Sequence, residues 1–285
     1  MAQVNDEDVQ AIRDWLAKEP HLPKNFDDNI LKKFIFSCHC SLEQTKKCID
    51  NFCTYRANLP EVYANRDPGS IKSKNAYSLT RVASYNAGTD EILIHQLVDS
   101  PDFSDIFDFY DILKAFSLTA DHWVRRPLLR LPEAHIVILD IKLYTLSLIA
   151  RVNIFYFQKF LNFLLESMPV RLKQVHIVNC PSYYEYLYNL VKGALPQDLK
   201  DMVRNCFHPD TEGLCQYIDK KYLPQEYGGD AQSINEQHAD WFKKVRDCRD
   251  LYTDDSIWKA NVGAKMKTCE KNISMNGSFK TLAID

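Results

Sequence analysis

Thiol and imidazole side chains cluster in one short stretch of the chain, where their chemistry suits metal binding. Cys38, His39 and Cys40 are consecutive, and Cys48 and Cys53 follow closely. Structural zinc sites usually take ligands in pairs whose members are separated by at least two residues. Here a single residue separates Cys38 from Cys40, and no second pair follows. We therefore interpret the nine cysteines, an odd number, as reduced thiols, with a metal site as the alternative.

Two further residues have the type and position of acid–base catalysts. Asp140 ends a strongly apolar segment, and His176 lies inside another. A carboxylate at a strand end usually binds nearby backbone groups, and a histidine within a strand is usually a hydrogen-bonded core residue. The sequence contains no nucleophile elbow, phosphate-binding loop, dinucleotide fingerprint or His-Glu-x-x-His run. It therefore predicts a protein that is not an enzyme and needs no cofactor, with catalysis at Asp140 as the alternative.

The composition of the whole chain excludes several classes of protein. Of the 285 residues, 46% are hydrophobic and 26% are charged, which is typical of a globular protein with about two domains. A net charge of -3 argues against a nucleic-acid binder, which is normally basic. No apolar stretch approaches the roughly 20 residues of a membrane-spanning helix, and the acidic N-terminus does not resemble a signal peptide. We expect a cytoplasmic monomer.

The elements that position these residues differ between the two halves of the chain. Residues 1–65 are predicted to form a helical domain, in which Asn5 caps one helix and Ser41 with Gln44 forms the capping box of another. Residues 66–88 are polar and are expected to be a linker.

Strands and helices are predicted to alternate over residues 89–235. The predicted strands cover 91–97, 135–141 and 174–179, and the predicted helices cover 103–124 and 153–168. The nearly continuous apolar run of the middle strand is typical of a parallel strand covered on both faces. This pattern predicts an α/β domain with a mostly parallel sheet, followed over 236–285 by a helical extension and a tail.

One predicted helix, from Pro181 to Leu195, is apolar on more than one face. One stripe consists of Tyr183, Leu187, Leu190 and Val191, and Tyr184 and Tyr188 lie on another. A helix of this kind must be covered on several sides. It is therefore either an internal packing helix or a lid over an apolar ligand.

Two runs of residues near this helix resemble a known family. Val175 to Pro181 reads Val-His-Ile-Val-Asn-Cys-Pro, and Leu223 to Gly229 reads Leu-Pro-Gln-Glu-Tyr-Gly-Gly. Both are similar to runs of the CRAL-TRIO lipid-binding domain family, in particular its animal α-tocopherol transfer protein and cellular retinaldehyde-binding protein group. The resemblance covers residues 5–245 and includes the helical domain.

The resemblance implies an all-helical N-terminal domain followed by an α/β domain whose sheet floors an apolar cavity. A mobile gate helix would span about Pro181 to Met202. The implied cavity residues are Leu113, Phe116, Ala120, Val137, Leu139, Phe160, Phe163, Leu164, Val175, Leu187 and Val191. The implied function is intracellular binding and transfer of a small hydrophobic ligand, which is a retinoid, a carotenoid, a tocopherol or another lipid. Phe116 and Ala120 occupy positions at which serines of a related protein help to hold the polar head of tocopherol. The resemblance therefore does not identify the ligand.

The resemblance also implies peripheral and transient contact with membranes. Basic residues match a site for anionic phosphoinositide headgroups, each contributing on the order of 1 kcal/mol near a membrane. Asp198 and Met202 stand where related proteins carry cations, which weakens this site. The alternative function is an interaction or phosphoinositide-sensing module without ligand transfer. The expected headgroup-binding residues are Arg56, Arg171, Lys173 and Lys192.

Overall fold

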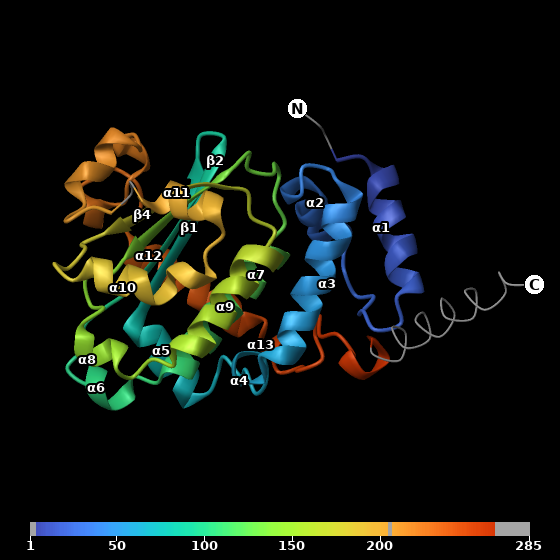
Figure 1. Ribbon diagram of the computed structural model, residues 1–285, viewed down its shortest axis with the longest axis horizontal. Helices are drawn as coiled ribbons and strands as arrows, with labels where there is room; N and C mark the ends of the chain where they lie inside the picture. The colour runs from blue at the N-terminus through green and yellow to red at the C-terminus, as the bar shows by residue number, and fades with distance from the viewer. Residues whose placement is uncertain (1–3, 205–206, 266–285) are drawn as a thin grey trace, which may run out of the picture.

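Helices form the N-terminal part of the protein in this computed structural model, which describes residues 4–204 and 207–265 (Figure 1). The Asn5 side chain accepts a hydrogen bond from the Asp8 N–H at 2.7 Å, and the Ser41 hydroxyl accepts one from the Gln44 N–H at 3.4 Å. Such caps satisfy backbone donors that the first turn of a helix leaves free. Both predicted helix starts are therefore confirmed. The helices are α1 (Asp6–Lys18), α2 (Asp28–Ser37), α3 (Leu42–Asn58) and α4 (Pro60–Tyr63).

Four strands form one sheet in the order β1-β2-β3-β4. β1 (Thr80–Ala87) pairs antiparallel with β2 (Asp90–Leu97), whereas β2, β3 (His135–Asp140) and β4 (Leu172–Val178) run parallel. This arrangement confirms the α/β class, the mostly parallel sheet and the three predicted strands. Parallel neighbours need crossover connections, which helices supply here.

Residues 66–88 are not the polar linker that the sequence suggested. They contain α5 (Ile71–Leu79) and β1, neither of which was predicted in full. Ala87 pairs with Asp90 across a two-residue turn, in which Gly88 has a φ of 68°. Glycine adopts this left-handed conformation at little cost. The Ala87-Gly88 dipeptide therefore marks a hairpin turn.

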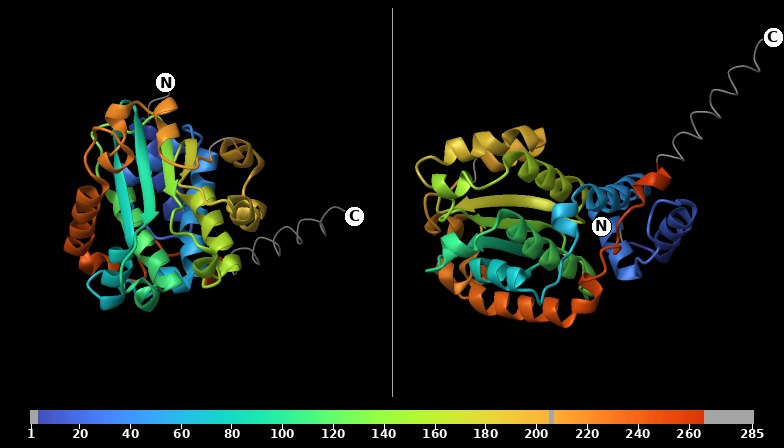
Figure 2. Two further views of the ribbon diagram at one scale, coloured as in Figure 1. Left: turned by 90° about the vertical axis from the view of Figure 1, so that its left-hand side faces the viewer. Right: turned by 90° about the horizontal axis from the view of Figure 1, so that it is seen from below.

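Helices cover one face of the sheet, and a largely irregular segment covers the other (Figure 2). α7 (Phe109–Arg125) and α9 (Ile154–Ser167) lie on the first face. Residues 207–233 lie on the second face, where Leu214, Ile218 and Leu223 belong to the same apolar cluster as the inward side chains of β2 and β3. α12 (Ile234–Asp247) packs on β1 and α11 (Gln197–Arg204) packs on β4, so both outer strands are covered.

The remaining helices are short and differ in part from the predicted ones. The helix predicted over 103–124 is divided into α6 (Phe103–Ile106) and α7, because Asp108 caps α7 by accepting from the Asp111 N–H at 2.9 Å. The helix predicted from Pro181 is shortened to α10 (Tyr184–Val191), which continues as a 3₁₀ turn, Lys192–Ala194. The others are α8 (Leu146–Ile149) and α13 (Arg249–Tyr252).

The predicted C-terminal extension is helical in its first part. The predicted extension contains α12 and α13, and residues 266–285 of the predicted tail lie outside the described part. None of the helices within the described ranges has the length and apolar character needed to cross a membrane.

The Leu-Pro-Gln-Glu-Tyr-Gly-Gly run closes the second face of the sheet. Gly228 has a φ of 74°, and a Cβ atom on Gly229 would lie 1.9 Å from the Leu223 carbonyl oxygen, so both glycines are required by geometry. The Glu226 carboxylate accepts hydrogen bonds from the Ser233 hydroxyl at 2.6 Å and the Ile234 N–H at 2.9 Å. The motif therefore caps the start of α12 through Glu226 and lies near the end of the 207–233 segment.

Candidate ligand-binding site

The two faces of the inner strand β3 are buried to different extents. Ile136 and Ile138, which face the 207–233 segment, are 7% and 0% exposed. Val137 and Leu139 point to the opposite face and are only partly buried, although β3 has a strand neighbour on each side. Apolar side chains on an inner strand between helices are normally fully buried. The helices above Val137 and Leu139 therefore leave apolar surface accessible.

This accessible surface extends to the neighbouring strands and to the helices that face them. Leu93 of β2 pairs with Val137, Ile177 of β4 pairs with Leu139, and both are partly buried. Three helices contribute further partly buried residues, which are Phe116, Leu161, Leu164, Leu165, Leu187, Tyr188 and Val191. We call these residues, together with Leu93, Val137, Leu139 and Ile177, the inner apolar surface.

α10 is the most weakly held element beside this surface. No residue of α10 is fully buried, whereas α9 buries Phe160 and Phe163. The Gln158 amide donates to the Leu190 carbonyl oxygen at 2.6 Å, and the Tyr184 and Tyr188 rings lie 5.0 and 5.7 Å from the Phe207 ring, measured between centroids. An element with few buried apolar contacts opens at low free-energy cost.

Two family models match this chain. The model described as Pinta-like, UBA domain matches residues 2–73, and the CRAL/TRIO domain model matches residues 105–229, which contain β3, β4 and α10. Over residues 105–229 this chain is similar to the CRAL/TRIO domain family, and its relatives include alpha-tocopherol transfer protein-like proteins. This family is known for binding and transferring lipophilic ligands.

The relatives of this chain are distant. The alpha-tocopherol transfer protein-like proteins of Homo sapiens and Mus musculus are 26% and 27% identical over 234 residues; the match covers 80% of this chain and 66% of theirs, just under two thirds of their length. Clavesin-2 of Homo sapiens is 23% identical over 285 residues, covering 94% of this chain and 81% of its own. The crystal structure of Sfh5 has a TM-score of 0.51 at 14% identity, covers 83% of this chain and 92% of that one, and supports the fold.

The residues implied by the CRAL/TRIO resemblance fall into two groups. Phe116, Val137, Leu139, Leu164, Leu187 and Val191 belong to the inner apolar surface, and Ala120 is also partly buried. Leu113, Phe160, Phe163 and Val175 are at most 7% exposed and belong to the packed core. Five residues of the inner apolar surface were not on the list, which are Leu93, Leu161, Leu165, Ile177 and Tyr188. Of these, Ile177 shares the two-residue alternation of its strand with Val175, which is on the list.

Phe163 lies in the core between the domains and not on the inner apolar surface. It is 0% exposed, and its ring centroid lies 6.1 Å from that of Phe52, 6.0 Å from that of Tyr55 and 5.4 Å from that of Tyr63. These partners belong to α3 and α4, so Phe163 lies on the side of α9 that faces the N-terminal helices. The structure therefore gives Phe163 a packing role.

Arg56 is buried and does not reach a membrane in this arrangement. Arg56, Arg66 and Asp121 are each 1% exposed. Arg56 Nη1 donates to Asp121 Oδ2 at 2.9 Å, and Arg66 Nη1 donates to the same oxygen at 2.6 Å. Burial alone would raise the pKa of Asp121, but the two guanidinium groups hold it below its usual value. The expected headgroup role of Arg56 is therefore replaced by a link between α3 and α7.

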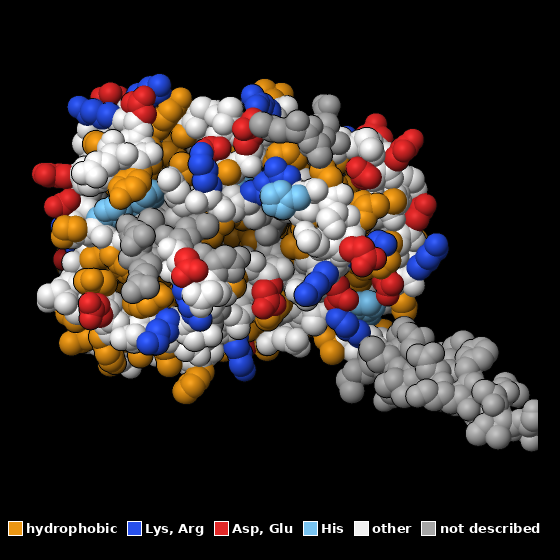
Figure 3. Space-filling view, turned by 45° about the horizontal axis from the view of Figure 1, so that its top comes forward, with side chains coloured by type: hydrophobic (Ala, Val, Ile, Leu, Met, Phe, Trp, Pro, Cys, Tyr) orange, Lys and Arg blue, Asp and Glu red, His pale blue; other side chains and the backbone are white. Residues whose placement is uncertain are grey.

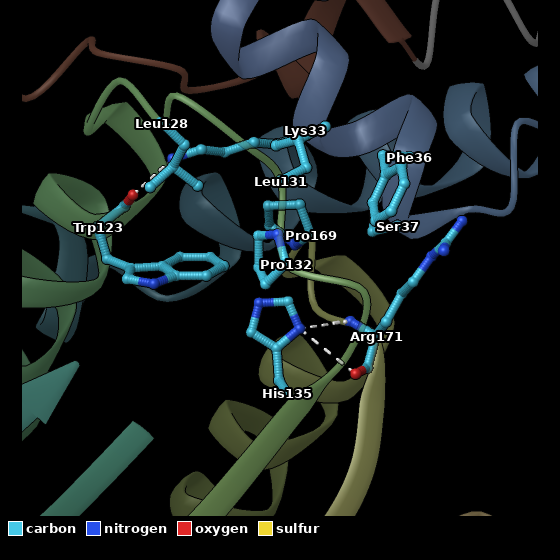
Figure 4. Close-up of a pocket in the computed structure, with 10 residues that line it drawn as sticks. All are labelled: Lys33, Phe36, Ser37, Trp123, Leu128, Leu131, Pro132, His135, Pro169 and Arg171. Atoms are coloured by element: carbon cyan, nitrogen blue, oxygen red, sulfur yellow. Dashed lines mark hydrogen bonds between the residues drawn. The ribbon is translucent and has the colours of Figure 1, made fainter. Parts of the chain in front are cut away.

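Arg171 lies at a small cavity between α2 and the sheet (Figure 4). The cavity volume is about 10 Å³, enough for at most one water molecule. The Arg171 guanidinium lies 3.7 Å from the centroid of the Phe36 ring. Beside it, the Lys33 ammonium donates to the carbonyl oxygens of Trp123, Val124 and Arg126 at 2.8, 2.8 and 2.7 Å. Lys33 thus satisfies the C-terminal carbonyls of α7 and fixes α2 to it.

The other expected headgroup residues are exposed. Lys173 Nζ donates to Asp90 Oδ2 at 2.7 Å, so part of its charge is neutralised within the protein. Lys192 follows α10 directly. The side chains of Asp198 and Met202 lie outside the described part of the structure.

Large apolar side chains are exposed near α10. Leu146 of α8, Phe155 of α9 and Tyr186 of α10 are 53%, 75% and 52% exposed. The Tyr183 hydroxyl donates to the Tyr144 carbonyl oxygen at 3.2 Å and so joins the start of α10 to the loop before α8. In Figure 3, hydrophobic side chains gather toward the lower left, the end of the molecule that carries α8 and α10. A surface of this kind favours contact with an apolar partner or a membrane.

The candidate catalysts have structural partners. Asp140 accepts hydrogen bonds from the Lys142 N–H at 3.0 Å and the Asn179 amide at 2.8 Å, and His176 Nδ1 lies 3.1 Å from His208 Nε2. Both side chains are therefore hydrogen-bonded within the protein, as is expected of structural residues.

A metal site at the cysteine cluster was the alternative interpretation. No group of three or more His, Cys, Asp and Glu residues with metal-binding geometry occurs in the described part of the chain. A hydrogen bond with Cys48 lowers the pKa of Cys38 to about 7.

Proposed function

We propose that this protein binds one small hydrophobic molecule on the inner apolar surface, beneath α10, and carries it between membranes. The partial burial of Val137 and Leu139 on an inner strand is the observation that supports this proposal. Transfer of apolar surface from water stabilises by about 25 cal/mol per Å². A ligand with roughly 300–400 Å² of apolar surface would therefore gain about 8–10 kcal/mol before association costs.

The proposed gate is the segment from Pro181 to Met202, which contains α10 and the first part of α11. The weak burial of α10 and the helix break at Lys192–Ala194 support its movement. The exposed Leu146, Phe155 and Tyr186 would insert into a membrane interface, and Lys192 would meet anionic headgroups there. Contact with the membrane would thus favour an open gate and release of the ligand. Arg171 and Lys173 would add to the attraction only through their remaining surface charge.

Filling the inner apolar surface tests this proposal. Leu139→Trp places an indole in the middle of the surface and is expected to weaken the binding of Nile red at least tenfold, as measured by fluorescence titration. Leu129→Trp is the matched control, because Leu129 is fully exposed and lies in the loop before β3. This control should bind as the wild type does. Equal binding by Leu139→Trp, with an unchanged circular dichroism spectrum, would contradict the proposed site and favour an interaction module.

A further inference from the structure

We propose that His95 is the polar anchor of the ligand site and that the ligand carries a single uncharged hydrogen-bonding group, such as a hydroxyl or a carbonyl. This inference rests on the proposed function, because it assigns the chemistry of the molecule bound there. His95 was not among the residues that the sequence singled out.

His95 lies within the apolar floor of the site. It is on β2, two residues after Leu93, so both side chains point to the same face of the sheet. Its register partners are Val82 on β1 and Leu139 on β3, and Ile177 is the next residue in that row. From above, the Phe116 ring of α7 meets the imidazole edge-on with centroids 5.5 Å apart.

The surroundings of His95 contain no charged side chain. The adjacent row of the sheet consists of Ser84, Leu93, Val137 and Val175, so neither row holds Lys, Arg, Asp or Glu. In these two rows, His95 is the only side chain with ring nitrogens. The other side chains are apolar, except for the Ser84 hydroxyl at the edge.

Other inward-facing imidazoles of the protein have hydrogen-bond partners. His238 accepts from the Val82 N–H and contacts the Tyr77 carbonyl oxygen at 3.0 Å, and His122 Nδ1 lies 3.2 Å from the Tyr252 hydroxyl. His95 has no hydrogen bond or ion pair among the residues that the structure describes, and its contact with Phe116 is between rings. The imidazole is only partly buried, and its nitrogens have no hydrogen-bond partner among the described residues. A ligand that displaced water from these nitrogens without offering a hydrogen-bonding group would leave them unsatisfied, which is unfavourable. A ligand with a hydrogen-bonding group would satisfy them.

The protonation state of His95 restricts the ligand to uncharged groups. Burial, followed by the nearby His238, lowers the pKa of His95 to about 4, so the ring is neutral near pH 7. A neutral imidazole offers one N–H donor and one acceptor nitrogen, which suits a hydroxyl or a carbonyl. It offers no charge to offset the burial of a carboxylate or a phosphate.

Three probes with one hydrocarbon chain test this assignment: hexadecan-1-ol, hexadecane and hexadecanoate. Displacement of Nile red should show that the wild-type protein binds the alcohol about tenfold more tightly than the hydrocarbon or the carboxylate, the effect of one hydrogen bond in an apolar site. His95→Leu should remove this preference by weakening the binding of the alcohol, while hexadecane should bind at least as tightly as it does to the wild type. His95→Gln, which keeps a donor and an acceptor, should retain a preference of severalfold.

The thermal midpoint of the ligand-free protein provides a second readout. Because His95 lacks a partner, His95→Leu is expected to leave the midpoint unchanged or raise it, whereas loss of a structural hydrogen bond would lower it. An alcohol preference that persists in His95→Leu, or a lowered midpoint for this variant, would contradict the proposed role of His95. Neither result would contradict ligand carriage. If none of the probes displaced Nile red from the wild-type protein, the result would contradict ligand carriage and, with it, the proposed role of His95.

Discussion

Asp121→Ala is expected to lower the free energy of unfolding by about 3–5 kcal/mol, because it leaves two buried guanidinium groups without their counter-ion. Arg56, Arg66 and Asp121 are each 1% exposed, so water cannot replace the lost carboxylate. Urea unfolding followed by circular dichroism measures the loss.

Two variants calibrate this result. Asp121→Asn keeps the shape of the side chain but removes its charge, and is expected to fall between the wild type and the alanine variant. Asp67→Ala removes an ion pair with Arg249, whose side chain is 58% exposed, and should cost less than about 1 kcal/mol. If Asp121→Ala proved as mild as Asp67→Ala, the buried triad would not be what joins α3 to α7.

Stability is also expected to fall steeply in mild acid. Burial lowers the pKa of His95, His122, His176 and His238 to about 4, whereas an unfolded histidine has a pKa near 6.5. Between these values the unfolded chain binds protons that the folded chain does not, so stability decreases as the pH falls from about 6.5 to 4 and is level above about 7. At pH 5 each fully buried histidine would cost about 2 kcal/mol, and the partly buried His95 and His122 less.

Urea unfolding at pH 7.5 and at pH 5 measures this effect. The pKa of Glu91 is lowered to about 2, so the stability that its carboxylate contributes is lost only below about pH 4.5. This loss lies outside the pH range that is compared. His176→Gln should have a smaller difference between the two pH values than the wild type. Equal free energies of unfolding at both pH values would show that these imidazoles are not held neutral by the fold.

Local signals in the sequence predicted much of the fold. The caps at Asn5 and Ser41 depend on residues three positions apart, and the apolar strands depend on short runs, so neither requires knowledge of distant contacts. β1 was missed because its alternation is weak and its pairing depends on the hairpin turn at Gly88. The resemblance predicted the similarity to the CRAL/TRIO domain family, and its implied cavity residues remain a prediction.

The individual roles of polar residues depended on tertiary structure. An arginine is normally expected at the surface. Only the folded chain shows that the carboxylate of Asp121, 65 positions away, neutralises the charge of Arg56. Phe163 was assigned to the cavity because one helix serves both the cavity and the domain junction, and the sequence does not show which side of α9 faces which partner. His95 was overlooked because a single histidine in a strand has no distinguishing local pattern.

Ligand capture tests carriage by this protein most directly. The purified protein is incubated with a cellular lipid extract, re-isolated and analysed by mass spectrometry, beside Leu139→Trp and Leu129→Trp. We predict that the wild type and Leu129→Trp retain about one molecule per chain of one class of uncharged hydrophobic compound, and that Leu139→Trp retains none. Equal lipid content in the wild type and Leu139→Trp would contradict the account.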